Sequence, residues 1–247
     1  MGSVSSSADA SGTNSDITSS DGPKVIAFDI DGTITTDGID LFMLSNRRLH
    51  QNIELFDEII RSWRVKKPLD PVHATLDMME QVLKSLPHHL SGKDFTRTVK
   101  RKTLDLISQN KIRSSAIQKI KQAINHGYTV FFCTTNYLDS ATGFANGLTE
   151  AGLLSDTERK KIIVTGSKID WDDKKVLFLN IDIGKVESIA NHYNISPDRV
   201  RDILFEAYGD EPTGNDKSLL NFAKKGFIVS TRANREYEAD NLSRLNW

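Results

Sequence analysis

The sequence predicts an α/β fold, with a parallel, doubly wound sheet and a helical insertion. Two observations support this prediction. Short apolar runs, rich in β-branched and aromatic residues, alternate with segments of helical spacing, as in a parallel sheet covered by helices. A long stretch, residues 37–127, has helical spacing and no comparable strand pattern, and it separates the first apolar run from the second.

The composition limits what the chain can do. Its 247 residues are enough for one large or two modest domains, and its net charge of -1 argues against a dominant electrostatic role on nucleic acid or anionic membrane. No apolar stretch approaches the roughly 20 residues that span a bilayer. Cys133 is the one cysteine, which excludes an internal disulfide framework and permits a reducing compartment. We therefore expect a cytoplasmic protein with neither a nucleic-acid partner nor a membrane span.

The N-terminal residues 1–22 are rich in Ser, Gly, Asp, Asn and Thr, with almost no large apolar side chain. Such a segment buries too little apolar surface to offset the entropy that ordering would cost. It also lacks the basic start and apolar centre of a secretory signal. We expect a disordered tail.

The first apolar run, residues 25–28, predicts a buried strand that ends at two acids, Asp29 and Asp31. Carboxylates at the end of a buried strand must be solvated, paired or bound to a metal. If the backbone stays extended, the side chains of i and i+2 lean toward the same face, so both acids reach one reacting centre. Gly32 allows a sharp turn, and Thr33 adds a hydroxyl and an N–H group at the same point.

The insertion, residues 37–127, predicts four helices, which prolines at 68, 71 and 87 help to separate. Ser91 is the expected N-cap of the third helix, and the sequence Asn-His-Gly at 125–127 ends the fourth. Four helices inserted after an αβ nucleus indicate a separate small bundle.

The second apolar run, residues 128–133, predicts another buried strand. Thr134, Thr135 and Asn136 follow it directly. Hydroxyls and the N–H groups of a turn that enters a helix suit a phosphate oxygen. The expected helix, residues 138–154, is weakened by glycines at 143, 147 and 152.

The remaining elements alternate in the same way. Residues 162–164 and 176–179 predict strands with a polar loop, 166–175, between them, and they belong either to the main sheet or to a side hairpin. Lys185 opens a helix, and Ser196–Pro197 begins a short one. A strand at 203–208 ends in an acidic turn, GDEPTGND at 209–216, which is costly without a cation. A last strand at 227–229 precedes a polar tail.

These features together resemble the haloacid dehalogenase (HAD) superfamily of phosphohydrolases, and most closely its phosphoserine-phosphatase-like branch. The apolar strand with DxDGT resembles the first HAD motif, the strand ending in Thr the second, a lysine at a helix start the third, and the acidic GD turn the fourth. The resemblance spans Lys24 to Asp216. It implies a Rossmann-like parallel sheet core, residues 23–36 and 128–247, and an inserted α-helical cap, residues 37–127, that covers the site.

The resemblance also implies catalytic roles. Asp29 would attack phosphorus and form an aspartyl phosphate, while Asp31 would act as the general acid and then the general base. Thr134, with Thr135 as the alternative, and Lys185 would hold the phosphoryl oxygens. Other candidates for the lysine are Lys168, Lys174 and Lys175.

A magnesium site and supporting residues follow from the same resemblance. Mg²⁺ would be bound by Asp29, the backbone carbonyl of Asp31 and Asp210. The residues expected around the phosphate are Gly32, Thr33, Thr135 and Asn136. The fourth motif of this branch reads GDxxND, and the turn in this chain is two residues longer. The supporting residues are therefore Glu211, Asn215 and Asp216, of which Asp216 would orient Lys185 or a metal-bound water.

The expected function is Mg²⁺-dependent hydrolysis of a phosphomonoester. The substrate is either a small phosphorylated metabolite, such as a phospho-amino acid or a sugar phosphate, or a phosphorylated protein side chain. One alternative is a HAD phosphotransferase, which product analysis with added alcohols would distinguish. The other is a HAD-fold binding protein without turnover. The longer fourth motif favours it, and metal-dependent phosphate release would exclude it.

Overall fold

The computed structural model describes residues 22–36, 45–47, 49–50, 52–231, 234 and 241–247. The tail predicted for residues 1–22 lies outside the described residues, except for Gly22. The part of the insertion between 37 and 44 lies outside them as well.

Seven strands form one sheet in the order β4-β3-β2-β1-β5-β6-β7, with β1 at its centre. All neighbouring strands are parallel except β3 and β4, which are antiparallel. The strands are β1 Val25–Phe28, β2 Thr129–Tyr137, β3 Ile162–Asp170, β4 Lys175–Phe178, β5 Leu204–Gly209, β6 Lys225–Val229 and β7 Leu242–Leu245.

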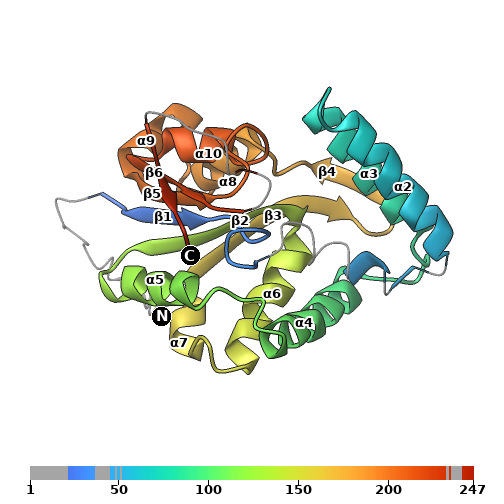
Figure 1. Cartoon of the computed structure of the whole chain (residues 1–247), viewed down its shortest axis with the longest axis horizontal. Helices are drawn as coiled ribbons and strands as arrows, with labels where there is room; N and C mark the ends of the chain where they lie inside the picture. Colours follow the sequence, from blue (N-terminus) through green and yellow to red (C-terminus); the bar gives the residue numbers. More distant parts are fainter. Residues whose placement is uncertain (1–21, 37–44, 48, 51, 232–233, 235–240) are drawn as a thin grey trace, which may run out of the picture.

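Helices cover both faces of this sheet (Figure 1). They are α2 Ile53–Lys66, α3 Pro71–Ser85, α4 Gly92–Ser108, α5 Ser114–Asn125, α6 Leu138–Glu150, α7 Asp156–Lys160, α8 Ile183–Tyr193, α9 Val200–Ile203 and α10 Lys217–Phe222, with a 3-10 turn at Pro197–Arg199. In Figure 1, α8, α9 and α10 lie above the sheet, and α5, α6 and α7 lie below it.

Strand β1 is covered by helices on both faces of the sheet, so all of its side chains are apolar. Val25 and Ala27 belong to the apolar cluster with α8 and α10, whereas Ile26 and Phe28 belong to the cluster with α5 and α6. All four side chains are almost fully buried. A continuous apolar run is therefore what the central strand of a sheet covered on both sides requires.

The four predicted insertion helices are present as α2 to α5, but they do not pack as one separate bundle. Helices α2 and α3 pack against each other, and Trp63 donates a hydrogen bond of 3.3 Å to Thr75. Helix α4 instead packs along α6, and α5 packs against β2. Ser91 caps α4 in a reciprocal capping box with Asp94, as predicted.

Two glycines of α6 allow α4 to pack closely against it, although glycine disfavours helix formation. A Cβ atom added at Gly143 would lie 2.5 Å from the carbonyl oxygen of Thr96, and one added at Gly147 would lie 2.6 Å from the Cβ of Thr103. These glycines therefore let the two helix backbones approach closely. Helices α4 and α5 pack on elements of the core. We therefore propose that the cap consists of α2 and α3 alone. The cap limits of 37–127 that the sequence suggested stay a prediction.

Two expectations for the sheet were incomplete. The predicted loop at 166–175 is mostly strand, because β3 continues to Asp170 and β4 begins at Lys175. Strand β3 pairs with β2 in the main sheet and, at its far end, with β4 as a hairpin, so both assignments hold in part. The tail expected after residue 229 contains β7, and Trp247 stacks on Tyr208 with 5.1 Å between ring centroids.

Of the helices that the structure describes, none is both long and apolar enough to cross a membrane.

Candidate active site

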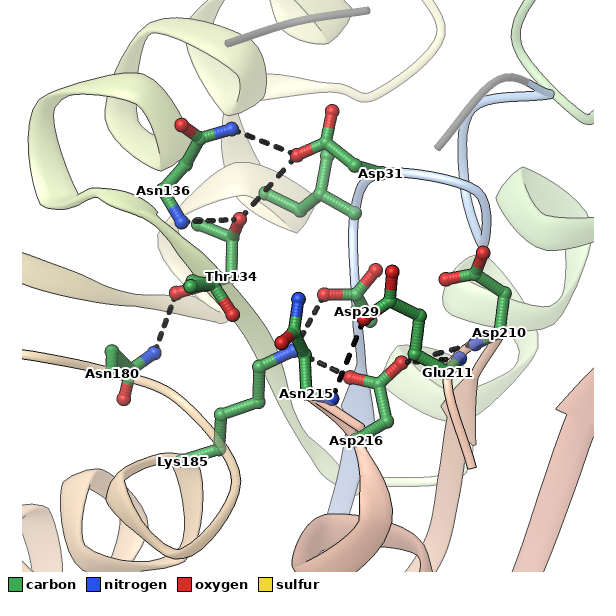
Figure 2. A network of polar contacts seen from close by, with 12 residues as sticks. Asp29, Asp31, Thr134, Asn136, Asn180, Lys185, Asp210, Glu211, Asn215 and Asp216 are labelled. Carbon is green, nitrogen blue, oxygen red and sulfur yellow. Dashed lines mark hydrogen bonds and ion pairs between the residues drawn. The ribbon is translucent and has the colours of Figure 1, made fainter. Parts of the chain in front are cut away.

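The carboxyl ends of the three central strands bring the predicted site residues together (Figure 2). Asp29 follows β1, Thr134 to Asn136 lie in the last part of β2, and Asp210 follows β5. Lys185 reaches the same point from α8. In parallel sheets, the crevice beyond the carboxyl ends of the strands is where ligands bind.

Lys185 lies at the centre of the cluster. Its Nζ lies 2.7 Å from Oδ1 of Asp29 and 2.5 Å from Oδ1 of Asp216, and its side chain has no exposed surface. Burial alone would lower the pKa of Lys185, but the charges and hydrogen bonds of Asp216 and Asp29 outweigh it and raise the pKa. The ammonium is therefore charged, and it holds the two carboxylates together.

Asp216 also closes the acidic turn. Its Oδ2 accepts hydrogen bonds from the backbone N–H groups of Asp210, at 3.1 Å, and Glu211, at 3.0 Å. A Cβ atom added at Gly209 would lie 2.7 Å from the Asp216 side chain, so the turn needs glycine there. The two extra residues of this motif thus leave Asp216 beside Lys185.

Three buried acids in this cluster suit a divalent cation. Oxygen atoms of Asp29, Asp210 and Asp216 lie within 4.8 Å of one another. Burial, followed by the charge of Asp216, raises the pKa of Asp29, and the same two causes raise the pKa of Asp210. Three carboxylates around one ammonium leave excess negative charge, and hard oxygen donors of this kind fit Mg²⁺. The predicted metal role of the Asp31 backbone carbonyl stays a prediction.

Asp31 is turned toward β2 rather than toward the three buried acids. Its Oδ2 accepts a hydrogen bond of 2.9 Å from Nδ2 of Asn136 and lies 3.5 Å from Oγ1 of Thr134. The backbone N–H of Asn136 donates to the same Thr134 hydroxyl at 3.1 Å. Figure 2 shows these three residues on one side of the site and Lys185 on the other. The predicted turn into a helix is instead the irregular end of β2, where its register with β3 shifts.

The other predicted residues are neighbours of these site residues along the chain. Gly32 has a φ of +81°, and a Cβ atom there would collide with the carboxylate of Asp210. The hydroxyls of Thr33 and Thr135 and Oδ1 of Asn215 are buried, and none has a hydrogen-bond partner in the part of the chain that the structure describes. Unpaired buried polar atoms are rare, so these three are candidates for contact with a bound group.

Of the four lysines that the sequence offered for the phosphate-binding role, Lys185 is the one that lies in the acid cluster. The Nζ of Lys174 donates to the carbonyl of Leu90 at 2.9 Å, which is a contact with the insertion. That of Lys168 lies 5.9 Å from the ring centroid of Phe178, and Lys175 is exposed at the start of β4. Among the described residues, Lys185 is the lysine that contacts the acid cluster.

Sequence reasoning missed three residues that support the site. The side chain of Asn180 donates to the carbonyl of Thr134 at 2.7 Å, and that of Asn234 donates to the carbonyl of Asp210 at 2.7 Å. Lys67, directly after α2, forms an ion pair with Glu211. Asn180 lies shortly before Lys185 after a predicted strand, which is a weak signal. Asn234 and Lys67 carry no local pattern, because only the fold brings them to the site.

Comparison with solved structures identifies the architecture. A substrate-bound phosphoserine phosphatase aligns at 18% identity over 90% of this chain and 92% of its own, with a TM-score of 0.52. A HAD family hydrolase from Salmonella enterica serovar Typhi aligns at 15% identity over 91% of this chain and 68% of its own, with a TM-score of 0.51. The chain has the HAD fold. Cytosolic 5'-nucleotidase IIIB bound to cytidine aligns at 15% identity over 90% of this chain and 80% of its own, with a TM-score of 0.56.

The HAD fold confirms the predicted α/β class with a Rossmann-like, mostly parallel sheet. No protein-family model and no curated protein sequence matches the chain. One fold hosts many reactions, so the function must be argued from the site itself.

Proposed function

We propose that this chain is a Mg²⁺-dependent phosphomonoester hydrolase of the HAD superfamily that acts through an aspartyl phosphate on Asp29. The observation that supports the proposal most strongly is the buried bridge from Lys185 to Asp29 and Asp216, with Asp210 in the same cluster. Burying three acids with one lysine is costly for folding, and an arrangement of this kind is typical of a site that binds charged groups.

The first step joins Asp29 to phosphorus. Oδ1 of Asp29 accepts the hydrogen bond from Lys185, so Oδ2 is the oxygen that attacks. As the new bond forms, the bond from phosphorus to the ester oxygen breaks, and Asp31 gives a proton to the departing oxygen. In the second step, Asp31 takes a proton from the water that attacks phosphorus, which releases phosphate and restores Asp29.

Lys185 and Thr134 hold the phosphoryl oxygens. An ammonium has three N–H donors, and Asp29 and Asp216 use two of them, which leaves one for a phosphoryl oxygen. A bound Mg²⁺, held by Asp29, Asp210 and a further oxygen ligand, would supply positive charge that offsets the charge of the phosphoryl group. The hydroxyls of Thr33 and Thr135 are the nearby buried donors that lack a partner among the described residues.

We propose a small phosphorylated molecule as the substrate, with a phosphorylated protein side chain as the alternative. Helix α2 reaches the edge of the site, because Lys67 contacts Glu211 next to Asp210. A helix pair docked there narrows the entrance and excludes water from the first step.

The test is phosphate release from 4-nitrophenyl phosphate, with Mg²⁺ or with a chelator, by the wild type and Asp29→Asn. The proposal predicts release that requires both the metal and Asp29. Release by Asp29→Asn at the wild-type rate would refute the nucleophile. The same assay with added alcohols separates hydrolysis from transfer, because a transferase would form new phosphate esters.

A further inference from the structure

The side chain of Asn136 contacts the proposed general acid and not the acid cluster. Its Nδ2 lies 2.9 Å from Oδ2 of Asp31, and the residue as a whole is 8% exposed. The sequence suggested a different role for Asn136, in binding phosphate. An amide nitrogen 2.9 Å from a carboxylate oxygen is instead a hydrogen bond to the acid.

Asn136 lies on a strand, whereas Asp31 lies in a turn. Asn136 belongs to β2, and its backbone N–H donates to the hydroxyl of Thr134. Thr134 is fixed in turn by Asn180, which donates to its carbonyl group at 2.7 Å. Asp31 lies in the turn after β1, outside any strand, and it is half-buried. The strand end therefore positions the acid of the turn.

The direction of this hydrogen bond identifies which oxygen of Asp31 is held. Nδ2 of an amide only donates, so Oδ2 of Asp31 must accept. The hydroxyl of Thr134 donates to the same oxygen at 3.5 Å. Both contacts reach Oδ2, so together they fix the orientation of the carboxyl group of Asp31.

We propose that Asn136 is a positioning residue that orients Asp31 for proton transfer to the leaving group. The inference rests on the proposed phosphatase function and deepens it. While the bond from Asp29 to phosphorus forms and the ester bond breaks, the proton passes from the carboxyl group of Asp31 to the leaving oxygen. Oδ2 keeps its hydrogen bond to Asn136 throughout.

A positioning role predicts a dependence on the leaving group. An alkyl phosphate needs a proton on its departing oxygen, whereas 4-nitrophenolate departs as an anion and needs the proton much less. Since general acid catalysis contributes about 10²–10⁴-fold, loss of its orientation should lower kcat for an alkyl phosphate by about 10–100-fold. The loss for 4-nitrophenyl phosphate should be about tenfold smaller.

The experiment measures kcat and KM of wild type and Asn136→Ala for both substrates, together with inhibition by inorganic phosphate. The alanine variant keeps the backbone N–H that donates to Thr134, so only the amide is lost. Asn136→Leu, which keeps the volume without the donor, is the second variant if alanine destabilises the fold. Asp31→Asn and the double variant with Asn136→Ala complete a cycle. Asn241→Ala is the matched control, because that amide donates to Asn221 in an exposed pair and contacts neither Thr134 nor Asp31.

The inference predicts a larger loss for the alkyl substrate in both Asn136 variants, and no further loss when Asn136→Ala is added to Asp31→Asn. The Asn241→Ala variant should keep the wild-type kcat for both substrates. Equal losses in the Asn136 variants, with weaker inhibition by phosphate, would overturn the inference and assign Asn136 to phosphate binding. A folded wild type that hydrolyses neither substrate would refute the proposed function, and this inference with it.

Discussion

Lys67 and Glu211 join the insertion to the acidic turn of the core. Nζ of Lys67 lies 2.7 and 2.9 Å from the two carboxylate oxygens of Glu211 and 5.0 Å from the ring centroid of Trp63. Glu211 follows Asp210 directly, and its backbone N–H donates to Asp216. The end of α2 is thus tied to the turn that carries two of the three clustered acids.

Glu211→Gln should loosen this contact without unfolding the protein. Both side chains are partly exposed, so the pair contributes about 0.2–1 kcal/mol to the packing of α2 against the acidic turn, a factor of up to about five. We expect a small change in Tm and a rise in kcat/KM for a phosphopeptide relative to 4-nitrophenyl phosphate. Lys66→Met is the control, because Lys66 pairs with Asp77 inside the helix pair. An unchanged substrate ratio in Glu211→Gln would mean that the contact does not control access.

Lys185→Met should be far more damaging than loss of a surface lysine. It leaves the carboxylates of Asp29 and Asp216 buried without their cation, which costs about 3–5 kcal/mol in the free energy of unfolding. Urea denaturation measures this loss. Lys175→Met, at an exposed position of β4, is the control and should change the unfolding free energy little. An equal free energy of unfolding in the two variants would contradict the buried ion pairs of Lys185 with Asp29 and Asp216.

Gly147→Ala tests the close packing of α4 on α6 by the sign of its effect. Helix propensity alone would make the variant more stable by about 1 kcal/mol. The added Cβ atom would lie 2.6 Å from the Cβ of Thr103, and overpacking of this kind costs about 1–3 kcal/mol. We therefore expect a lower midpoint in urea. A higher midpoint would show that the helices are not packed this closely.

Cys133 should be unreactive in the folded protein. Burial raises the pKa of its thiol to about 12, so the thiolate is scarce near neutral pH. A thiol reagent should label Cys133 only after unfolding in guanidinium, and it should leave the folded protein unmodified. Rapid labelling of the native protein at pH 7 would contradict the buried position of this residue on β2.

The sequence predicted those parts of the site that depend on local order. Asp29, Thr134 and Asp210 each stand at the end of an apolar run, and parallel strands bring such ends to one edge of a sheet. The core strands and the N-cap Ser91 are local features of the same kind. What the sequence could not predict depends on packing between distant segments.

Helix α4 is the clearest example of that limit. Its apolar spacing is the same whether it faces another insertion helix or α6. The glycines of α6 that allow the close contact lie about 45 residues further along the chain than the α4 residues they meet. Strand β7 is four residues long, too short for its alternation to be distinguished from a polar tail. Asn234 and Lys67 reach the site only through the tertiary fold.

The most direct test of the account is to trap the reaction on the protein. A substrate would be mixed with an excess of the Mg²⁺-loaded chain, quenched in acid and digested, and the peptides analysed by mass spectrometry. The proposed mechanism predicts a phosphoryl group on Asp29 in the wild type and none in Asp29→Asn. Phosphate release by the wild type, with a phosphoryl group on another residue or on none at any time, would contradict it.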